Sequence, residues 1–224
     1  MEGICASMPH RMLAKQMFLL LHDSFTGRPA AGPELLRCGV AAAALADLIL
    51  ARCLALEGDR IVVAGSRLDS AADEIGAFVV EMVRRQKKAY AVRSWVETLG
   101  ETLFDLVARS LVTEAVVRRE SGKRRVLHRM PDRFPGVDLR RAVGPRLQFE
   151  RMLRSSVEPE IGTVALAAIL CALGIEQVLN DEAESKAKWR NSIESAAQSL
   201  PDEMPGFVTG IEAVGAALLL KVRR

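Results

Sequence analysis

Residues 164–173 read VALAAILCAL and are followed directly by Gly174. A run of ten apolar residues that stops at a glycine is typical of a helix with a glycine just beyond its C-terminus. Because such a helix has no polar face to turn toward water, it must be surrounded by other elements. We therefore expect it to form the centre of the fold.

The segments on either side of this run also follow helical periodicity. Leu13, Met17, Leu20 and Leu21 lie on one helical face, and Pro33 is suited to the first position of a second helix. Similar apolar spacing predicts further helices at 72–86, 99–112, 139–152, 180–199 and 207–222. Asp69 or Ser70 is expected to cap the first of these helices, and Asp138 can cap the helix at 139–152. Pro145 should start a new turn in that helix or kink it.

Two β-hairpins are predicted between the helices. Residues 54–56 and 60–63 are largely apolar around a Glu57-Gly58-Asp59 turn, and residues 114–119 and 123–128 flank a Glu120-Ser121-Gly122 turn. With 50% hydrophobic and only 4% aromatic residues, the composition favours helices over a β-sandwich. The predicted fold is mainly α: one helical domain over residues 1–224 around a central apolar helix bundle, with two small β-hairpins at the edge.

The two ends of the chain and its apolar runs carry further expectations. Residues 1–10 are the segment expected to be disordered, and no signal-peptide pattern is present. The continuous apolar runs, 40–46 and 164–173, are shorter than the ~20 residues of a membrane span. We therefore expect no membrane-spanning segment and a cytoplasmic protein that can still lie on a membrane surface.

No recognisable catalytic motif occurs in the sequence. It lacks the G-x-S-x-G, P-loop, dinucleotide and H-E-x-x-H patterns, and no two of its four cysteines have C-x-x-C spacing. His22-Asp23 is interpreted as part of a helix end or loop, and Gly206, Gly210 and Gly215 as sites of close helix packing. We expect no enzyme activity, no catalytic residues, no cofactor and no metal site.

Local positive charge is the strongest functional signal. Thirty-one Lys and Arg against 28 Asp and Glu give a net charge of only +3, so clustering matters more than the total. Positive charges concentrate at residues 84–88 and along residues 114–133, hereafter the basic arm. A solvated hairpin explains the basic arm, but so does contact with lipid headgroups or a nucleic-acid backbone.

Six segments, taken in order, resemble the Golgi phosphoprotein 3 family, which also has bacterial members. They are LLLHDSFTGR (19–28), LALEGDRI (54–61), SWVETL (94–99), residues 111–120, RFP (133–135) and ALAAIL (165–170). The similarity spans roughly residues 10 to 220 and identifies the chain as resembling a bacterial-type member. It implies a mostly helical domain around a central bundle with β-hairpins at its edge.

The resemblance also implies a function. Eukaryotic relatives are peripheral membrane proteins that bind phosphatidylinositol 4-phosphate and act as adaptors for Golgi glycosyltransferases. An ungapped alignment places their headgroup-binding Trp and Arg positions at Gly32, Ala41, Glu101 and Phe104, and none matches. Because phosphate recognition needs charge-assisted donors, the family lipid site is not transferred to this chain, and Arg37 is the nearest possible substitute.

The leading hypothesis is a non-enzymatic adaptor-type domain that binds an anionic, phosphoinositide-like membrane surface or a membrane-linked protein, with a possible homo-oligomer. Residues expected to contact the anionic surface are Arg37, Arg118, Arg119, Lys123, Arg124, Arg125 and Arg129. The alternative is nucleic-acid binding by a winged-helix-like helix and hairpin at 103–127, although Arg109 is the only basic residue of its helix. A structural partner protein with no ligand is a third possibility.

Overall fold

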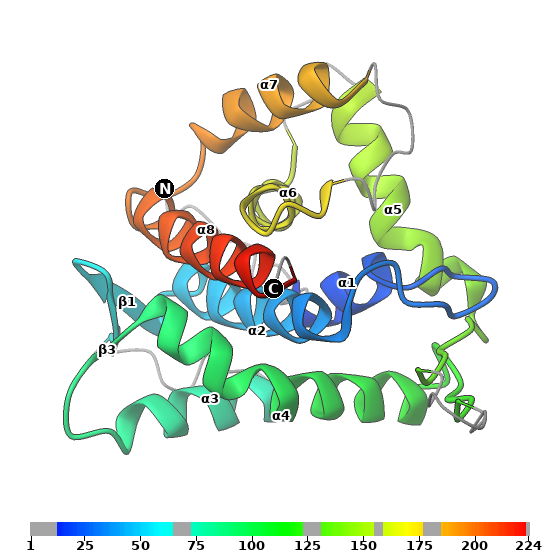
Figure 1. The fold of residues 1–224 in the computed structure, drawn as a ribbon, viewed down its shortest axis with the longest axis horizontal. Helices are drawn as coiled ribbons and strands as arrows, with labels where there is room; N and C mark the ends of the chain where they lie inside the picture. Colours follow the sequence, from blue (N-terminus) through cyan, green and yellow to red (C-terminus); the bar gives the residue numbers. More distant parts are fainter. Residues whose placement is uncertain (1–12, 65–72, 123–130, 155–158, 177–184, 223–224) are drawn as a thin grey trace, which may run out of the picture.

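Helix α6 (Ile161–Ala172) occupies the centre of the fold. The computed structural model describes residues 13–64, 73–122, 131–154, 159–176 and 185–222, and Figure 1 shows α6 end-on with other helices around it. The other helices are α1 (Leu13–Leu20), α2 (Pro33–Leu50), α3 (Glu74–Arg84), α4 (Val92–Thr113), α5 (Leu139–Arg154), α7 (Ser185–Ala197) and α8 (Glu203–Val222). The protein is therefore mainly α, as predicted.

The apolar run that predicted a central helix is buried along most of its length. Every side chain from Val164 to Leu170 is buried, and Gly174 ends the helix with a φ of +68°. Helix α6 packs against α2, α5, α7 and α8, which explains why it needs no polar face. The helix starts three residues before the predicted run, at Ile161.

Helices α2 and α4 form the broad layer beneath α6 (Figure 1). Residues 40–46 of α2 are all buried, as their uniformly apolar sequence predicts. The two helices approach closely at Gly100, where an added Cβ would lie 3.3 Å from the Cβ of Arg37. The absence of a side chain at Gly100 thus allows α2 and α4 to approach closely at this point.

A three-stranded antiparallel sheet lies at one edge. Strands β1 (Leu54–Glu57) and β2 (Arg60–Val63) form the first predicted hairpin around Gly58, whose φ is +64°. The third strand, β3 (Tyr90–Ala91), pairs with β2 and was not predicted. A strand of two residues is too short to show an alternating pattern.

The second predicted hairpin has a different partner strand. Bridges join Val117 to Gly136 and Glu120 to Arg133, so residues 117–120 pair with 133–136, a segment that contains Pro135. The turn predicted at 120–122 favoured pairing with the segment that follows it directly. The observed pairing joins residues 117–120 to a segment farther along the chain. Residues 123–130 lie outside the described residues.

Three details of the helices go beyond or differ from the predicted ones. The N-cap of α3 is Asp73, whose carboxylate accepts a hydrogen bond from the backbone N–H of Gly76; Asp69 and Ser70 lie outside the described residues. Helix α4 begins at Val92, seven residues before the predicted start at residue 99. Helix α5 runs as one element from Leu139 to Arg154 with Pro145 inside it, so the proline does not start a separate helix.

Helix α8 is long and apolar enough, by length and composition, to cross a membrane. The sequence analysis missed it because Thr209 and Glu212 interrupt the apolar run. Met204, Phe207 and Ile211 are nevertheless fully buried, and α8 packs on α2, α4 and α6. One face of α8 is therefore packed into the core while 33% of the apolar window is buried, and length and composition alone are weak evidence for a span.

Candidate functional site

Both described arginines at the start of the basic arm are exposed and ion-paired. Arg118 lies 2.9 Å from Glu120, and Arg119 lies 2.6 Å from Asp132. Exposed pairs of this kind contribute little to stability, about 0–1 kcal/mol, and their charges stay accessible to solvent. Lys123, Arg124, Arg125 and Arg129, predicted for the same surface, lie outside the described residues.

Arg37 lies far from the basic arm in sequence and has a partner of its own. Its guanidinium lies 3.4 Å from the carboxylate of Glu101 across α2 and α4. Ala41 is fully buried, and the ring centroid of Phe104 is 5.0 Å from that of Phe18. Two of the four aligned headgroup positions are therefore core positions, and a third is a carboxylate already bound to Arg37.

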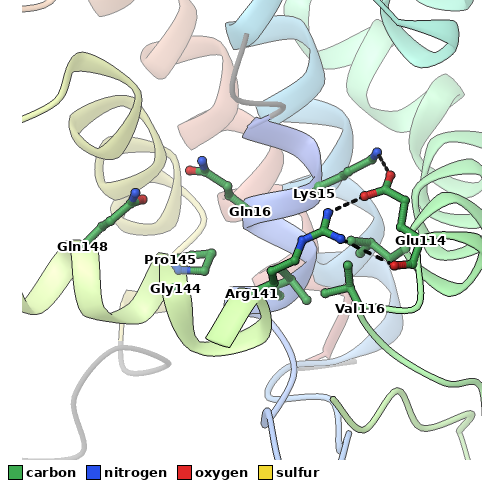
Figure 2. Close-up of a pocket in the computed structure, with 10 residues that line it drawn as sticks. Lys15, Gln16, Glu114, Val116, Arg141, Gly144, Pro145 and Gln148 are labelled. Atoms are coloured by element: carbon green, nitrogen blue, oxygen red, sulfur yellow. Dashed lines mark hydrogen bonds and ion pairs between the residues drawn. The ribbon is translucent and has the colours of Figure 1, made fainter. Parts of the chain in front are cut away.

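A cleft of ≈ 470 Å³ opens between α1, the end of α4 and α5 (Figure 2). We call it the Glu114 cleft. Its lining is partly polar and partly apolar: Lys15, Gln16, Leu19, Leu111, Glu114, Val116, Arg141, Gly144, Pro145 and Gln148. Sequence reasoning missed this site because its charged residues come from three separate segments with no motif in common.

Glu114 holds two cations in this cleft. Lys15 donates to one carboxylate oxygen, and Arg141 Nη2 donates to the other at 2.5 Å (Figure 2). Ser110 Oγ donates a further hydrogen bond at 3.1 Å. Burial raises the pKa of Glu114, but the bonds from Lys15, Arg141 and Ser110 outweigh it and leave the pKa below its usual value. This network joins α1, α4 and α5.

His22 and Asp23 do not form an acid–base pair, as predicted. His22 is buried beside Phe18, with Nδ1 2.8 Å from the Phe18 carbonyl oxygen, and burial lowers its pKa to about 4. Asp23 faces the following loop, where it accepts hydrogen bonds from the Thr26 hydroxyl and from backbone N–H groups. The hydrogen bond from the Thr26 side chain is the largest cause of its lowered pKa. Both residues have structural roles at the end of α1.

Helix α5 is a basic element that the sequence analysis did not select. Residues 139–154 contain five arginines and one glutamate. Arg140 and Arg146 are exposed, and α5 begins immediately after the segment paired with the basic arm. Counting charges per predicted helix would have found this signal.

The cysteines do not lie in a metal-ligand cluster within the described residues. Cys38 and Cys53 are buried, Cys171 is half-buried, and burial raises the pKa of Cys171 to about 11. Among the described residues, no group of three or more His, Cys, Asp and Glu side chains is arranged to hold a metal ion. A raised thiol pKa also disfavours the reactive thiolate at Cys171.

Helix α4 gives the nucleic-acid alternative no support. Its basic residues Arg93 and Arg109 contact their own helix, through Glu97 and the Asp105 carbonyl respectively. Helix α4 also packs against α1, α2, α3 and α8, which is unlike a recognition helix that offers a free face.

Comparison with known protein families identifies a related family. A family model described as Golgi phosphoprotein 3 (GPP34) matches residues 13–207, which is most of the chain. No curated protein sequence matches it. The matched range includes α1 to α7, the sheet and the basic arm.

Proposed function

The chain belongs to the Golgi phosphoprotein 3 family, and from this we propose that it is a non-enzymatic domain that binds peripherally to an anionic membrane surface on the cytoplasmic side. The family is not known for enzymatic activity. The observation that carries the proposal is the concentration of exposed arginines at one end of the molecule. Arg118 and Arg119 lie in the segment that pairs with 133–136, and α5, which carries Arg140 and Arg146, begins directly after that segment.

Charge attraction to a surface suits these arginines better than a specific headgroup pocket. They come from the basic arm and from α5, and each nearby basic residue is worth about 1 kcal/mol at an anionic membrane. The aligned family positions supply no donors, since Glu101 is acidic and Ala41 is buried. We therefore expect binding to follow the density of negative charge in the membrane more closely than the identity of the lipid.

Vesicle co-sedimentation tests this function. Wild-type protein should sediment with vesicles of phosphatidylcholine containing phosphatidylserine, should not sediment with pure phosphatidylcholine, and should dissociate as salt is raised. Charge reversal at Lys123, Arg124 and Arg125 should abolish sedimentation if the basic arm makes the contact. The double variant Lys87→Glu with Lys88→Glu is the matched control. These exposed lysines lie just before the N-terminus of α4, whereas the basic arm follows its C-terminus. Figure 1 shows the two ends of α4 on opposite sides of the molecule.

Other results would contradict the proposal. Absence of binding to any anionic vesicle would favour a partner-protein role, and a salt-sensitive DNA shift without vesicle binding would favour the nucleic-acid alternative. If charge reversal leaves the vesicle affinity unchanged, the basic arm does not make the contact with the membrane.

A further inference from the structure

Three exposed apolar side chains gather where the loop after α1 meets the start of α5. The exposed fractions are 71% for Phe25, 53% for Val137 and 43% for Leu139. We call these residues the Phe25 patch. Figure 1 shows their two segments side by side at the end of the molecule that carries the basic arm.

Backbone contacts hold the two segments together. The N–H of Gly136 donates to the Ser24 carbonyl at 2.9 Å, and the N–H of Phe134 donates to the Gly27 carbonyl at 2.9 Å. A Cβ on Gly136 would lie 2.9 Å from the Ser24 carbonyl oxygen and 3.1 Å from Leu139 Cδ2, so the backbone before Val137 runs close to both Ser24 and Leu139. The patch is therefore one surface built from two segments.

The loop that carries Phe25 is fixed in shape. Asp23 accepts hydrogen bonds from the backbone N–H groups of Phe25 and Thr26, at 3.2 and 2.6 Å. Gly27 has a φ of +64°, and a Cβ there would lie 2.1 Å from Pro135 N. Because this turn cannot easily rearrange, Phe25 is held away from the core formed by Phe18, His22 and Phe134.

Positive charge surrounds the patch. Arg28 is exposed on the same loop, and Arg140 and Arg146 are exposed on α5. Two carboxylates lie in these segments: Asp23 accepts hydrogen bonds from the loop N–H groups and also attracts Arg146, and Asp138 accepts from the N–H of Arg141 at 3.2 Å. An apolar centre with an arginine rim is complementary to a membrane interface, where acyl chains lie beneath anionic phosphates.

We infer that the Phe25 patch inserts into the headgroup–acyl boundary of an anionic membrane while the α5 arginines contact lipid phosphates. The inference rests on the proposed function and adds to it an apolar contact, made by a rigid turn and separate from the basic arm. Arginine suits this role because its planar guanidinium binds phosphate oxygens in pairs.

The test replaces the aromatic ring and measures vesicle affinity. Phe25→Ser should weaken binding to phosphatidylserine-containing vesicles about tenfold, with an unchanged unfolding midpoint because the ring is exposed. Leu220→Ser is the matched control, since Leu220 is 67% exposed at the end of α8, and it should bind as wild type. Phe25→Trp should bind normally, and its emission should shift to the blue when these vesicles are added, by more than the emission of wild type, whose Trp95 and Trp189 supply the background.

The outcomes separate this inference from the proposed function. If Phe25→Ser binds as wild type while reversal of the basic arm abolishes binding, the protein attaches by charge alone and the insertion is refuted. If wild type binds no anionic vesicle, both proposals fail. A blue shift of Phe25→Trp that depends on protein concentration, without vesicles, would show that a second copy covers the patch and would also refute it.

Discussion

The guanidinium of Arg37 on α2 lies 3.4 Å from the carboxylate of Glu101 on α4. The family alignment placed an acidic residue at Glu101, where relatives have an arginine, and suggested Arg37 as a substitute donor. The structure shows that these two features of the sequence neutralise each other. An arginine bound to a neighbouring carboxylate is a weaker phosphate ligand than one that faces solvent alone.

Removing Glu101 should therefore strengthen binding to anionic vesicles. Glu101→Gln releases Arg37, and one additional basic group near the surface, at about 1 kcal/mol, corresponds to about a fivefold gain in affinity. The double variant Arg37→Gln with Glu101→Gln should lose the gain. Stability should change by less than about 1 kcal/mol, because the pair is exposed. An equal gain in the double variant would show that Arg37 is not the released group.

The Glu114 network is expected to matter for stability. Glu114→Gln leaves Lys15 and Arg141 without their carboxylate, and we expect the free energy of unfolding to fall by about 1 to 2 kcal/mol at pH 7. Since the pKa of Glu114 is lowered in the folded protein, this difference should be full above pH 4.5 and disappear as the pH falls through the lowered pKa. Urea unfolding at pH 7 and pH 3 measures both quantities.

A matched control for Glu114 is Glu120, whose pair with Arg118 is exposed. Glu120→Gln should change the free energy of unfolding by less than about 1 kcal/mol at either pH. Equal losses from the two variants would mean that the Glu114 network is no more than another surface ion pair.

Sequence periodicity was sufficient for the helices because each buries an apolar face that recurs locally. The run at 164–173 and the caps at Asp138 and Gly174 needed no knowledge of the rest of the chain. The partner of residues 117–120 and the strand at Tyr90–Ala91 are set by contacts distant in sequence, which local patterns do not contain.

The candidate site was less predictable than the fold. Lys15 and Glu114 are 99 positions apart, and Phe25 meets Val137 and Leu139 only through the loop contact at Gly136. Charge clustering led to Arg118 and Arg119, but it did not reveal that each has a carboxylate partner. The five arginines of α5 are visible in the sequence, but they are spread along a helix and form no continuous run, so only a count of charges per helix reveals them.

The glycines of α8 give a test of helix packing. A Cβ on Gly210 would lie 2.7 Å from Val92 Cβ, whereas a Cβ on Gly206 would lie 3.6 Å from Leu56 Cδ2, an ordinary contact. Gly210→Ala should destabilise the protein by about 1 to 3 kcal/mol through overpacking. Gly206→Ala should be neutral or stabilising by up to about 1 kcal/mol, since alanine favours helix. Thermal unfolding of both variants checks the contrast, and equal midpoints would contradict it.

His22 should make the protein less stable in mild acid. Burial lowers its pKa from 6.5 to about 4, so between these values the unfolded chain binds a proton that the folded protein does not. The free energy of unfolding must then rise with pH across this window, by up to about 1.4 kcal/mol per pH unit. It should therefore be lower at pH 5 than at pH 6.5 by about 1.5 to 2 kcal/mol. His22→Gln, whose amide can still donate to the Phe18 carbonyl, removes the titrating group.

The measurement for His22 is the urea unfolding free energy of both proteins at intervals from pH 4 to pH 8. The wild-type curve should fall below pH 6.5 more steeply than the His22→Gln curve, and the two should run parallel above it. His10 and His128 are present in both proteins, so their contributions cancel in the difference. Parallel curves throughout would mean that His22 titrates normally in the folded state, and hence that its burial beside Phe18 and Phe134 is not maintained in solution.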